Sequence, residues 1–462
     1  MTAQPGGGRE GDGGAGAEAE GGAPAEGGVP VEGGAPVEGG APAEGAPAET
    51  RTSPAGRRPT APGGHVLRTF LPGGVCAVPG IRAAGVTAGL KPSGRPDVAL
   101  VAAETTVAAA AVQTRNQVKA APVQVTARHV ADGRARAVLL NAGSANVCTG
   151  PDGVALAEES AAVAAAALGC DAADVLVCST GVIGVALARE PFLAGIGRAA
   201  EALSPTGGTD AATAVMTTDT VPKEAAVRVV DAADGSCLVG GMAKGSGMIA
   251  PELATMLCVL TTDAPIGGHV LRATLADVVA RTFGRISVDG CMSTNDAVVI
   301  LATGTAERPP TIAAFTDGLT AVCARLAEAL VRDGEGAAKL LRIRVMGAKS
   351  EADAVGVGRA VAGSALVRTA VAGGDPNWGR VLAAVGAGPV TIDPHRIAVA
   401  FAGVTVCRFG VATAYDPGQA AMALRGRDVT LTVDLGVGSG EATFLTCDLT
   451  HDYVTINAEY TT

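Results

Sequence analysis

The stretch GGMAKGSGMIAPELATMLCVLTTDA, residues 240–264, decides how the rest of the chain is interpreted. A glycine-rich loop that carries Lys244 and Ser246 leads to Thr255, and the apolar run Met256–Leu260 follows directly. A short apolar run bounded by turn residues is typical of a buried strand. A threonine that opens such a strand suits a nucleophile, although on spacing alone an ordinary strand threonine is the commoner interpretation.

A backbone cut before Thr255 would supply the base that this nucleophile needs. The cut places a free α-amine, with an unperturbed pKa near ~7.7–8.0, on the residue that carries the hydroxyl. That amine can take the proton of its own hydroxyl without a histidine. The chain has only 5 histidines and no G-x-S-x-G elbow, so a Ser-His-Asp triad is not indicated.

Two glycine motifs do not predict nucleotide binding. The loop around Lys244 lacks the G-x-x-x-x-G-K-[ST] spacing of a phosphate-binding loop. The segment GVGSG at 436–440 precedes a strand-like segment rather than a helix, which argues against a dinucleotide site. We expect a hairpin turn there, between strands at 429–433 and 442–447.

Composition excludes several classes of protein. Apolar residues make up 48% of 462, enough for a large core, but aromatics are 2%, so Ala, Val and Leu must build it. The net charge of −10 and the lack of a basic stripe argue against nucleic acid as a partner. No apolar stretch reaches the ~18 residues of a membrane span. Ten cysteines scattered singly predict buried free thiols in a reducing cytoplasm, and no histidine pair predicts a metal site.

The chain divides into a low-complexity arm and a globular body. Residues 1–62 repeat Gly, Ala, Pro and Glu without an apolar period, so we expect disorder. The body alternates elements: predicted strands lie at 99–103, 137–140 and 175–178, and predicted helices at 154–168, 271–283 and 319–331. Interspersed strands and helices predict an α/β or α+β fold.

Motifs along most of the body resemble the ornithine acetyltransferase family, the glutamate N-acetyltransferases of arginine synthesis. The signature is KGSGMIAPELATMLCVLTTDA. Nine more segments are similar: AAGVTAGLKPSGRPDVALV at 83–101, TRNQVKAAPV at 114–123, NAGSANVCTG at 141–150, STGVIG at 179–184, MTTDTVPKE at 216–224, DGCMSTNDAV at 289–298, DGEGAAKL at 333–340, DPNWGRVLAAVG at 375–386 and INAEYTT at 456–462.

The resemblance implies a self-cleaving acyltransferase with a layered α/β/β/α body. Autoproteolysis between Ala254 and Thr255 would give an α chain from the body at 63–254 and a β chain at 255–462, assembled as α2β2. Thr255 would begin a central strand, take acetyl from N-acetylornithine and pass it to glutamate with ping-pong kinetics. No cofactor is implied, although some relatives also use acetyl-CoA.

The resemblance also assigns site residues. Thr180 and Gly181 match the oxyanion hole, where a hydroxyl and a backbone N–H can stabilise one developing charge. Six residues match the positions that contact substrate in the family: Thr217, Lys244, Thr255, Glu335, Asn457 and Thr462. We expect Lys244 to bind a substrate carboxylate and Glu335 to meet the ornithine ammonium.

Several questions stay open at the level of sequence. Thr217 and Thr218 compete within MTTDT, and the roles of Asp289-Gly290, Asn295-Asp296 and the DPNWGR segment at 375–380 are undecided. Glu252-Leu253 departs from the Asn-Met that many relatives carry before the cut. Alternative functions are a self-cleaving aminopeptidase or amidohydrolase, an uncut binding protein, and an acyltransferase of secondary metabolism on the same scaffold.

Overall fold

The computed structural model describes residues 66–250 and 256–459. All of them belong to the second of two units, Ala61–Thr462. The predicted disordered arm at 1–62 lies outside the described residues, and so do Ala254, Thr255 and Thr462.

Nine strands of the described part form one sheet. Its order is β1-β6-β7-β8-β10-β3-β4-β5, and β2 pairs with β3 off this path. The strands are β1 (Leu67–Leu71), β2 (Ile81–Val86), β3 (Val98–Gln113), β4 (Arg134–Ser144), β5 (Val175–Val182), β6 (Lys223–Val230), β7 (Ser236–Lys244), β8 (Leu257–Thr262) and β10 (Ala297–Ala302).

Successive side chains of a strand point to opposite faces of a sheet, so the two faces of this sheet pack against different partners. On β3, Val98 and Leu100 pack on helices, while Ala99 and Val101 join a cluster that also contains Leu257 of β8. The β3–β4 half and the β8–β10 half of the sheet therefore share one apolar layer between them.

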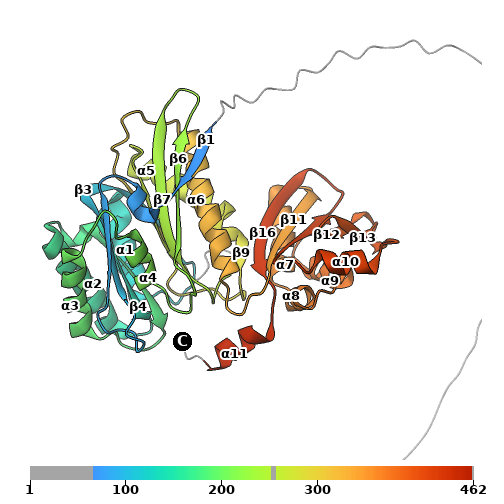
Figure 1. Ribbon diagram of the computed structural model, residues 1–462, viewed down its shortest axis with the longest axis horizontal. Coiled ribbons are helices and arrows are strands. Elements are labelled where there is room, and N and C mark those ends of the chain that lie inside the picture. The colour runs from blue at the N-terminus through green and yellow to red at the C-terminus, as the bar shows by residue number, and fades with distance from the viewer. Residues whose placement is uncertain (1–65, 251–255, 460–462) are drawn as a thin grey trace, which may run out of the picture. The chain divides into compact units, whose positions relative to one another are not determined.

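Helices cover the outer faces of both halves. The β3–β4 half packs on α1 (Ala121–His129), α2 (Gly150–Leu168) and α3 (Arg189–Glu201). The β8–β10 half packs on α5 (Gly268–Arg281) and α6 (Ile312–Arg332), and α4 (Gly208–Ala214) contributes to the middle layer. Figure 1 shows α2 and α3 beside β3 and β4, with α6 alongside β7. The predicted α/β/β/α layering is confirmed.

Small residues make these layers pack closely, as the composition predicted. The buried face of α2 consists largely of alanines, among them Ala157, Ala161 and Ala164. Alanine has the highest helix propensity and lets a helix approach a sheet closely. The longer α6 buries Phe315, Leu319 and other large side chains, each worth about 1.5–3 kcal/mol of burial.

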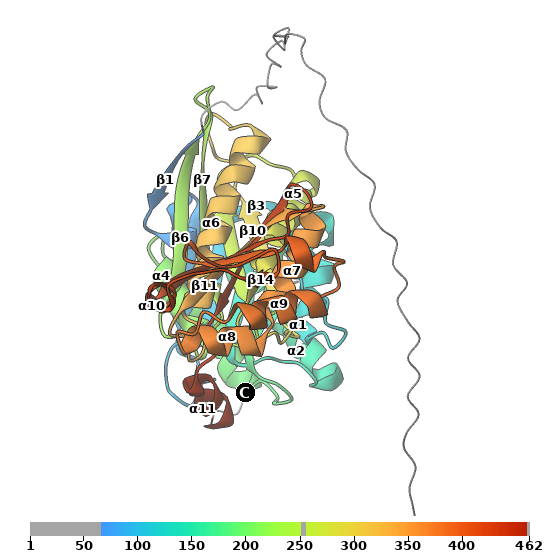
Figure 2. The same cartoon turned by 90° about the vertical axis from the view of Figure 1, so that its right-hand side faces the viewer.

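The final third of the chain builds a second sheet. Its order is β14-β13-β12-β15-β11-β16-β9, and it has its own core against four helices (Figures 1 and 2). The strands are β9 (Ile286–Ser287), β11 (Leu340–Ala348), β12 (Ala398–Phe401), β13 (Val404–Arg408), β14 (Val411–Ala412), β15 (Asp428–Asp434) and β16 (Gly440–Cys447). The helices are α7 (Glu351–Ala362), α8 (Ala365–Ala372), α9 (Trp378–Ala387) and α10 (Pro417–Ala423), and α11 (His451–Glu459) follows β16.

The prediction of a hairpin at 436–440 is wrong. The flanking strands β15 and β16 do not pair; they lie on either side of β11, parallel and antiparallel to it. The loop crosses the end of β11, where Gly347 O accepts the N–H groups of Val437 and Gly438. A Cβ at position 438 would lie 2.3 Å from Ala348 O, so the glycine is needed for this crossing.

Two other sequence features receive an explanation. Asn377 of the DPNWGR segment caps α9 by accepting the N–H of Arg380. Trp378 packs against the core of the second sheet, so these two residues have structural roles. All ten cysteines are free thiols; six are buried, while Cys148 and Cys291 are exposed, unlike the expectation.

Strand β8 lies in the middle of the nine-stranded sheet. It pairs antiparallel with β7, which precedes the predicted cut, and parallel with β10, which follows it. The predicted boundary between 63–254 and 255–462 therefore runs through one hydrogen-bonded sheet and not between two domains.

Within the described residues no single helix is long and apolar enough to cross a membrane. One bent pair of helices, α7 with α8, has the length and composition of a membrane span when the two are taken together.

Candidate active site

One pocket gathers six of the predicted site residues. They come from β5, the segment before β6, the end of β7, the loop after α6, and α11: Thr180, Gly181, Thr217, Lys244, Glu335 and Asn457. These positions span most of the body in sequence. The other three predicted positions, Ala254, Thr255 and Thr462, lie outside the described residues.

Thr180 and Gly181 lie at the end of β5, as the sequence predicted. β5 pairs in parallel with β4, and Gly181 faces Gly143 across a register shift. Gly181 has φ +132, and a Cβ there would lie 2.3 Å from the carbonyl carbon of Gly143. Only glycine fits this position. The hydroxyl of Thr180 is buried at the pocket wall.

Lys244 is the last residue of β7, and its ammonium group is buried in the pocket wall. Nζ donates to Oγ1 of Thr217 at 2.8 Å and to Oγ1 of Thr180 at 3.2 Å. A hydroxyl that accepts from an ammonium keeps its own hydrogen free to donate. Thr180 can therefore donate into the pocket while Lys244 polarises it.

A buried ionic network supports Lys244, and sequence reasoning missed it. Oδ1 of Asp219 accepts from Nζ of Lys223 at 2.6 Å and from the N–H of Gly245 at 2.7 Å, and Oδ2 lies 3.9 Å from Nζ of Lys244. Lys223 also pairs with Asp333 at 2.6 Å. The signal was present in MTTDTVPKE, where Asp219 and Lys223 are four residues apart.

Burial and charge pull the pKa values of this network in opposite directions. Burial alone would raise the pKa of Asp219, but the ammonium groups of Lys244 and Lys223 outweigh it and lower that pKa to about 2. Burial lowers the pKa of Lys244, and the carboxylate of Asp219 opposes that change. Asp219 is therefore ionised at neutral pH and balances two buried cations.

Glu335 and Asn457 meet at the far side of the pocket. Nδ2 of Asn457 donates to Oε2 of Glu335 at 2.9 Å, and the N–H of Glu335 donates to Ser246 O at 2.8 Å. The residues described for α11 include none that is buried, and this hydrogen bond joins the helix to the pocket. A carboxylate at this position suits a cationic group of a ligand.

Thr217 and Thr218 make different contacts in the pocket. Both residues line the pocket, but only Thr217 contacts Lys244. The hydroxyl of Thr218 instead shares a hydrogen bond of 2.6 Å with Ser246. Thr217 is thus the one that belongs to the Lys244 cluster.

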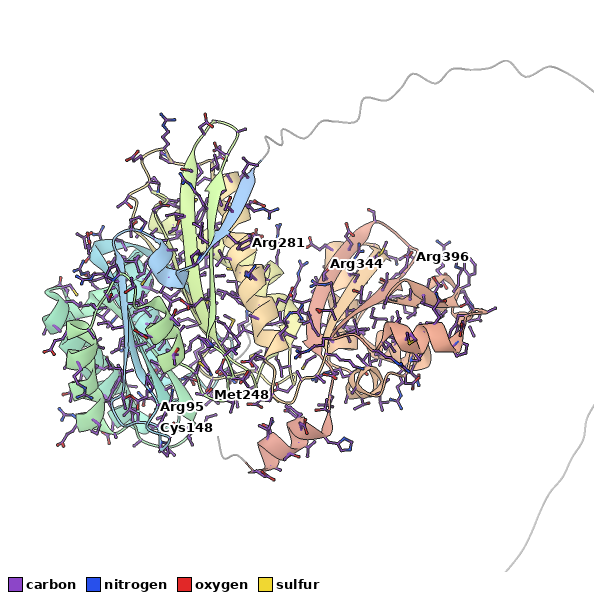
Figure 3. The ribbon with its side chains drawn as sticks, viewed as in Figure 1. Arg95, Cys148, Met248, Arg281, Arg344 and Arg396 are labelled. Atoms are coloured by element: carbon purple, nitrogen blue, oxygen red, sulfur yellow. The ribbon has the colours of Figure 1, made fainter. Side chains whose placement is uncertain are left out.

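The loop DGCMSTND at 289–296 contacts the chain on both sides of the stretch 251–255. Asp289 accepts the N–H groups of Met248, which Figure 3 labels below β7, and of Ile249. Asp296 accepts the N–H of Met256 at 3.1 Å. Burial raises the pKa of both carboxyl groups, that of Asp296 well above its usual range. The sequence had left these two residues undecided.

The pocket combines the elements of an acyl-transfer site. It offers a polarised hydroxyl beside a glycine N–H, a buried ammonium and a carboxylate, and strand β8 begins two residues after Thr255. Within residues 66–250 and 256–459, no three His, Cys, Asp or Glu side chains are grouped as a metal site requires. Because the pocket holds one cationic and one anionic side chain, Lys244 and Glu335, it suits a small zwitterionic molecule.

The family model and the sequence relatives both indicate one family. The model of the ArgJ family matches residues 82–462. The "Arginine biosynthesis bifunctional protein ArgJ" of Mycobacterium tuberculosis is 48% identical over 395 residues, covering 84% of this chain and 96% of that protein. The protein of the same name from Thermobifida fusca is 49% identical over 389 residues, covering 84% and 100%. A crystal structure of the ornithine acetyltransferase of Mycobacterium tuberculosis complexed with ornithine is 47% identical, covers 41% of this chain and all of that chain, and aligns with a TM-score of 0.38.

Proposed function

The chain belongs to the ArgJ family, and from this premise we propose that it transfers acetyl from N2-acetyl-L-ornithine to L-glutamate through an acetyl ester on Thr255. The products are L-ornithine and N-acetyl-L-glutamate, the latter an early intermediate of arginine synthesis. The observation that carries the proposal is the convergence of six predicted site residues on one pocket.

The reaction begins with the cut between Ala254 and Thr255. The freed α-amine takes the hydroxyl proton as Oγ attacks the acetyl carbonyl carbon of acetylornithine. The carbonyl–nitrogen bond then breaks, the proton passes to the departing amine, and ornithine leaves. The amine of glutamate attacks the ester in the same way, which restores the threonine hydroxyl. Each half-reaction balances without a cofactor.

Thr180 and Gly181 stabilise the negative oxygen of both tetrahedral intermediates, since a donor hydroxyl and an N–H meet at the end of β5. We expect Thr180→Val, which removes the hydroxyl and keeps the shape, to lower kcat about 10²–10³-fold with little change in KM. Steady-state kinetics with acetylornithine and glutamate measures this. Thr443→Val, on an exposed position of β16, is the control and should match wild type. An unchanged kcat for Thr180→Val removes this hydroxyl from the mechanism.

The two charged groups of the pocket are matched to an amino-acid substrate. In this proposal Lys244 binds the α-carboxylate, and Glu335, which accepts a hydrogen bond from Asn457, binds the side-chain ammonium of ornithine. Charge-assisted hydrogen bonds of this kind are about twice as strong as neutral ones.

Deletion of residues 457–462 tests whether the end of the chain takes part. Loss of the Asn457 contact with Glu335, together with the predicted contact of Thr462, should raise KM for acetylornithine at least about 10-fold. Thr455→Ala, two residues earlier on α11, is the matched control. Wild-type kinetics after the deletion excludes a substrate role for these residues.

Mass spectrometry of the purified protein, with and without a pulse of acetylornithine, tests the function itself. We expect two polypeptides that separate at Ala254–Thr255 and an acetyl adduct on the piece that begins with Thr255. The pieces should co-elute under native conditions because β8 stays hydrogen-bonded to β7. An aminopeptidase or amidohydrolase would instead release acetate from acetylornithine without glutamate, and a single unbroken chain would exclude the mechanism.

Three finer points belong to the same proposal. Acetyl-CoA is a second donor, which the word "bifunctional" in the names of the relatives supports; acetylation of glutamate without acetylornithine is the test. The pieces assemble as an α2β2 heterotetramer, which sedimentation of the cut protein can check. The compartment is the cytoplasm, in keeping with ten free thiols.

A further inference from the structure

A single loop, Asp289–Asp296, holds the chain on both sides of the stretch 251–255. Ahead of the stretch, Asp289 accepts the N–H groups of Met248 and Ile249, the second at 2.9 Å. Behind it, Oδ1 of Asp296 accepts the N–H of Met256 at 3.1 Å. The first and last residues of the loop thus fix the two flanks.

The contact made by Asp289 holds a strained backbone. Met248 has φ +54, in the left-handed region that costs a residue with a side chain about 1–3 kcal/mol. Ile249 is fully buried, and its carbonyl oxygen accepts from the N–H groups of Val288 at 2.9 Å and Gly290 at 3.2 Å. The loop therefore holds this flank through its backbone as well as through the carboxylate.

The contact made by Asp296 reaches the residue after the predicted nucleophile. The N–H that it accepts belongs to the peptide bond that joins Thr255 to Met256. Asp296 is fully buried, and among the described atoms its second oxygen, Oδ2, has no hydrogen-bond partner.

The residue beside it ties the same loop to the predicted oxyanion hole. Nδ2 of Asn295 donates to Ala145 O at 2.6 Å and to Ser179 O at 2.9 Å, and Ser179 directly precedes Thr180. Asn295 and Asp296 together therefore set the distance between the end of β5 and the start of β8.

We propose that Asp289 and Asp296 are positioning residues: both hold the flanks of the Ala254–Thr255 bond for cutting, and Asp296 in addition holds the cut threonine against Thr180 and Gly181 for acetyl transfer. This inference rests on the proposed function. Its physical basis is that a misplacement of about 1 Å in a reacting group can cost 10²-fold in rate.

The test compares four variants of the full-length chain with wild type. Cutting is followed on denaturing gels as the ratio of full-length chain to pieces against time after synthesis, and kcat and KM are measured on the cut fraction. Asp289→Ala should slow cutting about 10-fold, and Asp296→Ala about 10²-fold with a similar fall in kcat and KM within about 3-fold. Asp296→Asn keeps an oxygen acceptor for the Met256 N–H and should recover most of both rates.

Asp263→Asn is the matched control, because Asp263 lies at the other end of β8 and also accepts a backbone N–H, that of Leu238. It should cut and transfer as wild type does. If Asp296→Ala does not fold, Asp296→Glu takes its place, since one added methylene moves the carboxyl while keeping its chemistry, and it should be slow in both steps.

The outcomes separate the inference from the function on which it rests. Wild-type rates in Asp296→Ala, or in Asp296→Glu where that variant replaces it, overturn the inference and leave the proposed function standing. A loss in KM alone, with kcat unchanged, also overturns it. A wild-type chain that stays uncut refutes the proposed function, and the positioning roles fall with it.

Discussion

A Thr255→Ala variant stays a single polypeptide and transfers no acetyl group. The substitution removes the hydroxyl that attacks in both reactions, and without a cut the α-amine that would serve as base never forms. In a serine protease with a Ser-His-Asp triad, removing the nucleophile and its base together costs on the order of 10⁶-fold in kcat, and we expect a loss of similar size here. Denaturing gels and the kinetics of glutamate acetylation measure the two effects in one preparation.

A second variant, Thr255→Ser, keeps a hydroxyl, and a cut before the serine would still free its α-amine. It should cut and transfer more slowly than wild type, but measurably. Acetyl transfer at the wild-type rate by the uncut Thr255→Ala variant would exclude the N-terminal-nucleophile mechanism.

Replacing Asp219 by Asn should destabilise the fold and lower activity strongly. Asp219 balances two buried ammonium groups, those of Lys223 at 2.6 Å and Lys244 at 3.9 Å. Removing one partner of a buried ion pair leaves uncompensated charge and costs about 3–5 kcal/mol. The same loss moves Lys244 away from Thr180 and Thr217, so kcat should fall at least about 10²-fold. Urea unfolding and steady-state kinetics measure the two effects.

The pH dependence of stability identifies the same carboxyl. Its pKa in the folded protein is about 2, below its ordinary value of 3.8. A lowered pKa contributes stability that is fully present above about pH 4 and is lost as the pH falls through about 2. The wild type should therefore lose stability over that window, on the order of 2 kcal/mol, and Asp219→Asn should lack this component.

Asp317→Asn controls for the loss of an ordinary carboxylate. Asp317 pairs with Arg68 at the surface, where both side chains are more than a third exposed, so its loss should cost less than about 1 kcal/mol. Equal stability of Asp219→Asn and wild type at neutral pH would show that the buried network does not support the pocket.

The elements that were predicted correctly are those with a strong local pattern. The apolar runs at 175–178 and 429–433 lie within β5 and β15, and the alanine-rich segment at 154–168 lies within α2. Boundaries were less accurate: α6 begins at Ile312, seven residues before the predicted start, because Thr311 caps it by accepting the N–H of Ala314. The hairpin at 436–440 failed because strand pairing is not a local property.

The sequence also predicted only part of the candidate site. The motifs located Thr180, Lys244, Glu335 and the other pocket residues without any geometry. They did not indicate that Lys223 and Asp333, 110 residues apart, form one network with Asp219. Nor did they indicate that Asp289 and Asp296 hold the flanks of the predicted cut.

The sequence by itself predicted the chemistry, through the resemblance of its motifs to one family: a threonine after a glycine loop, at the head of an apolar strand, that would act as the nucleophile. That information is local, because a hydroxyl and a new α-amine on one residue are joined by covalent bonds. Only the tertiary structure decided which groups surround that residue, such as Asn457 on Glu335 across 122 residues. Such contacts depend on how layers pack and which charges are buried together, and these are properties of the whole chain and of no single segment.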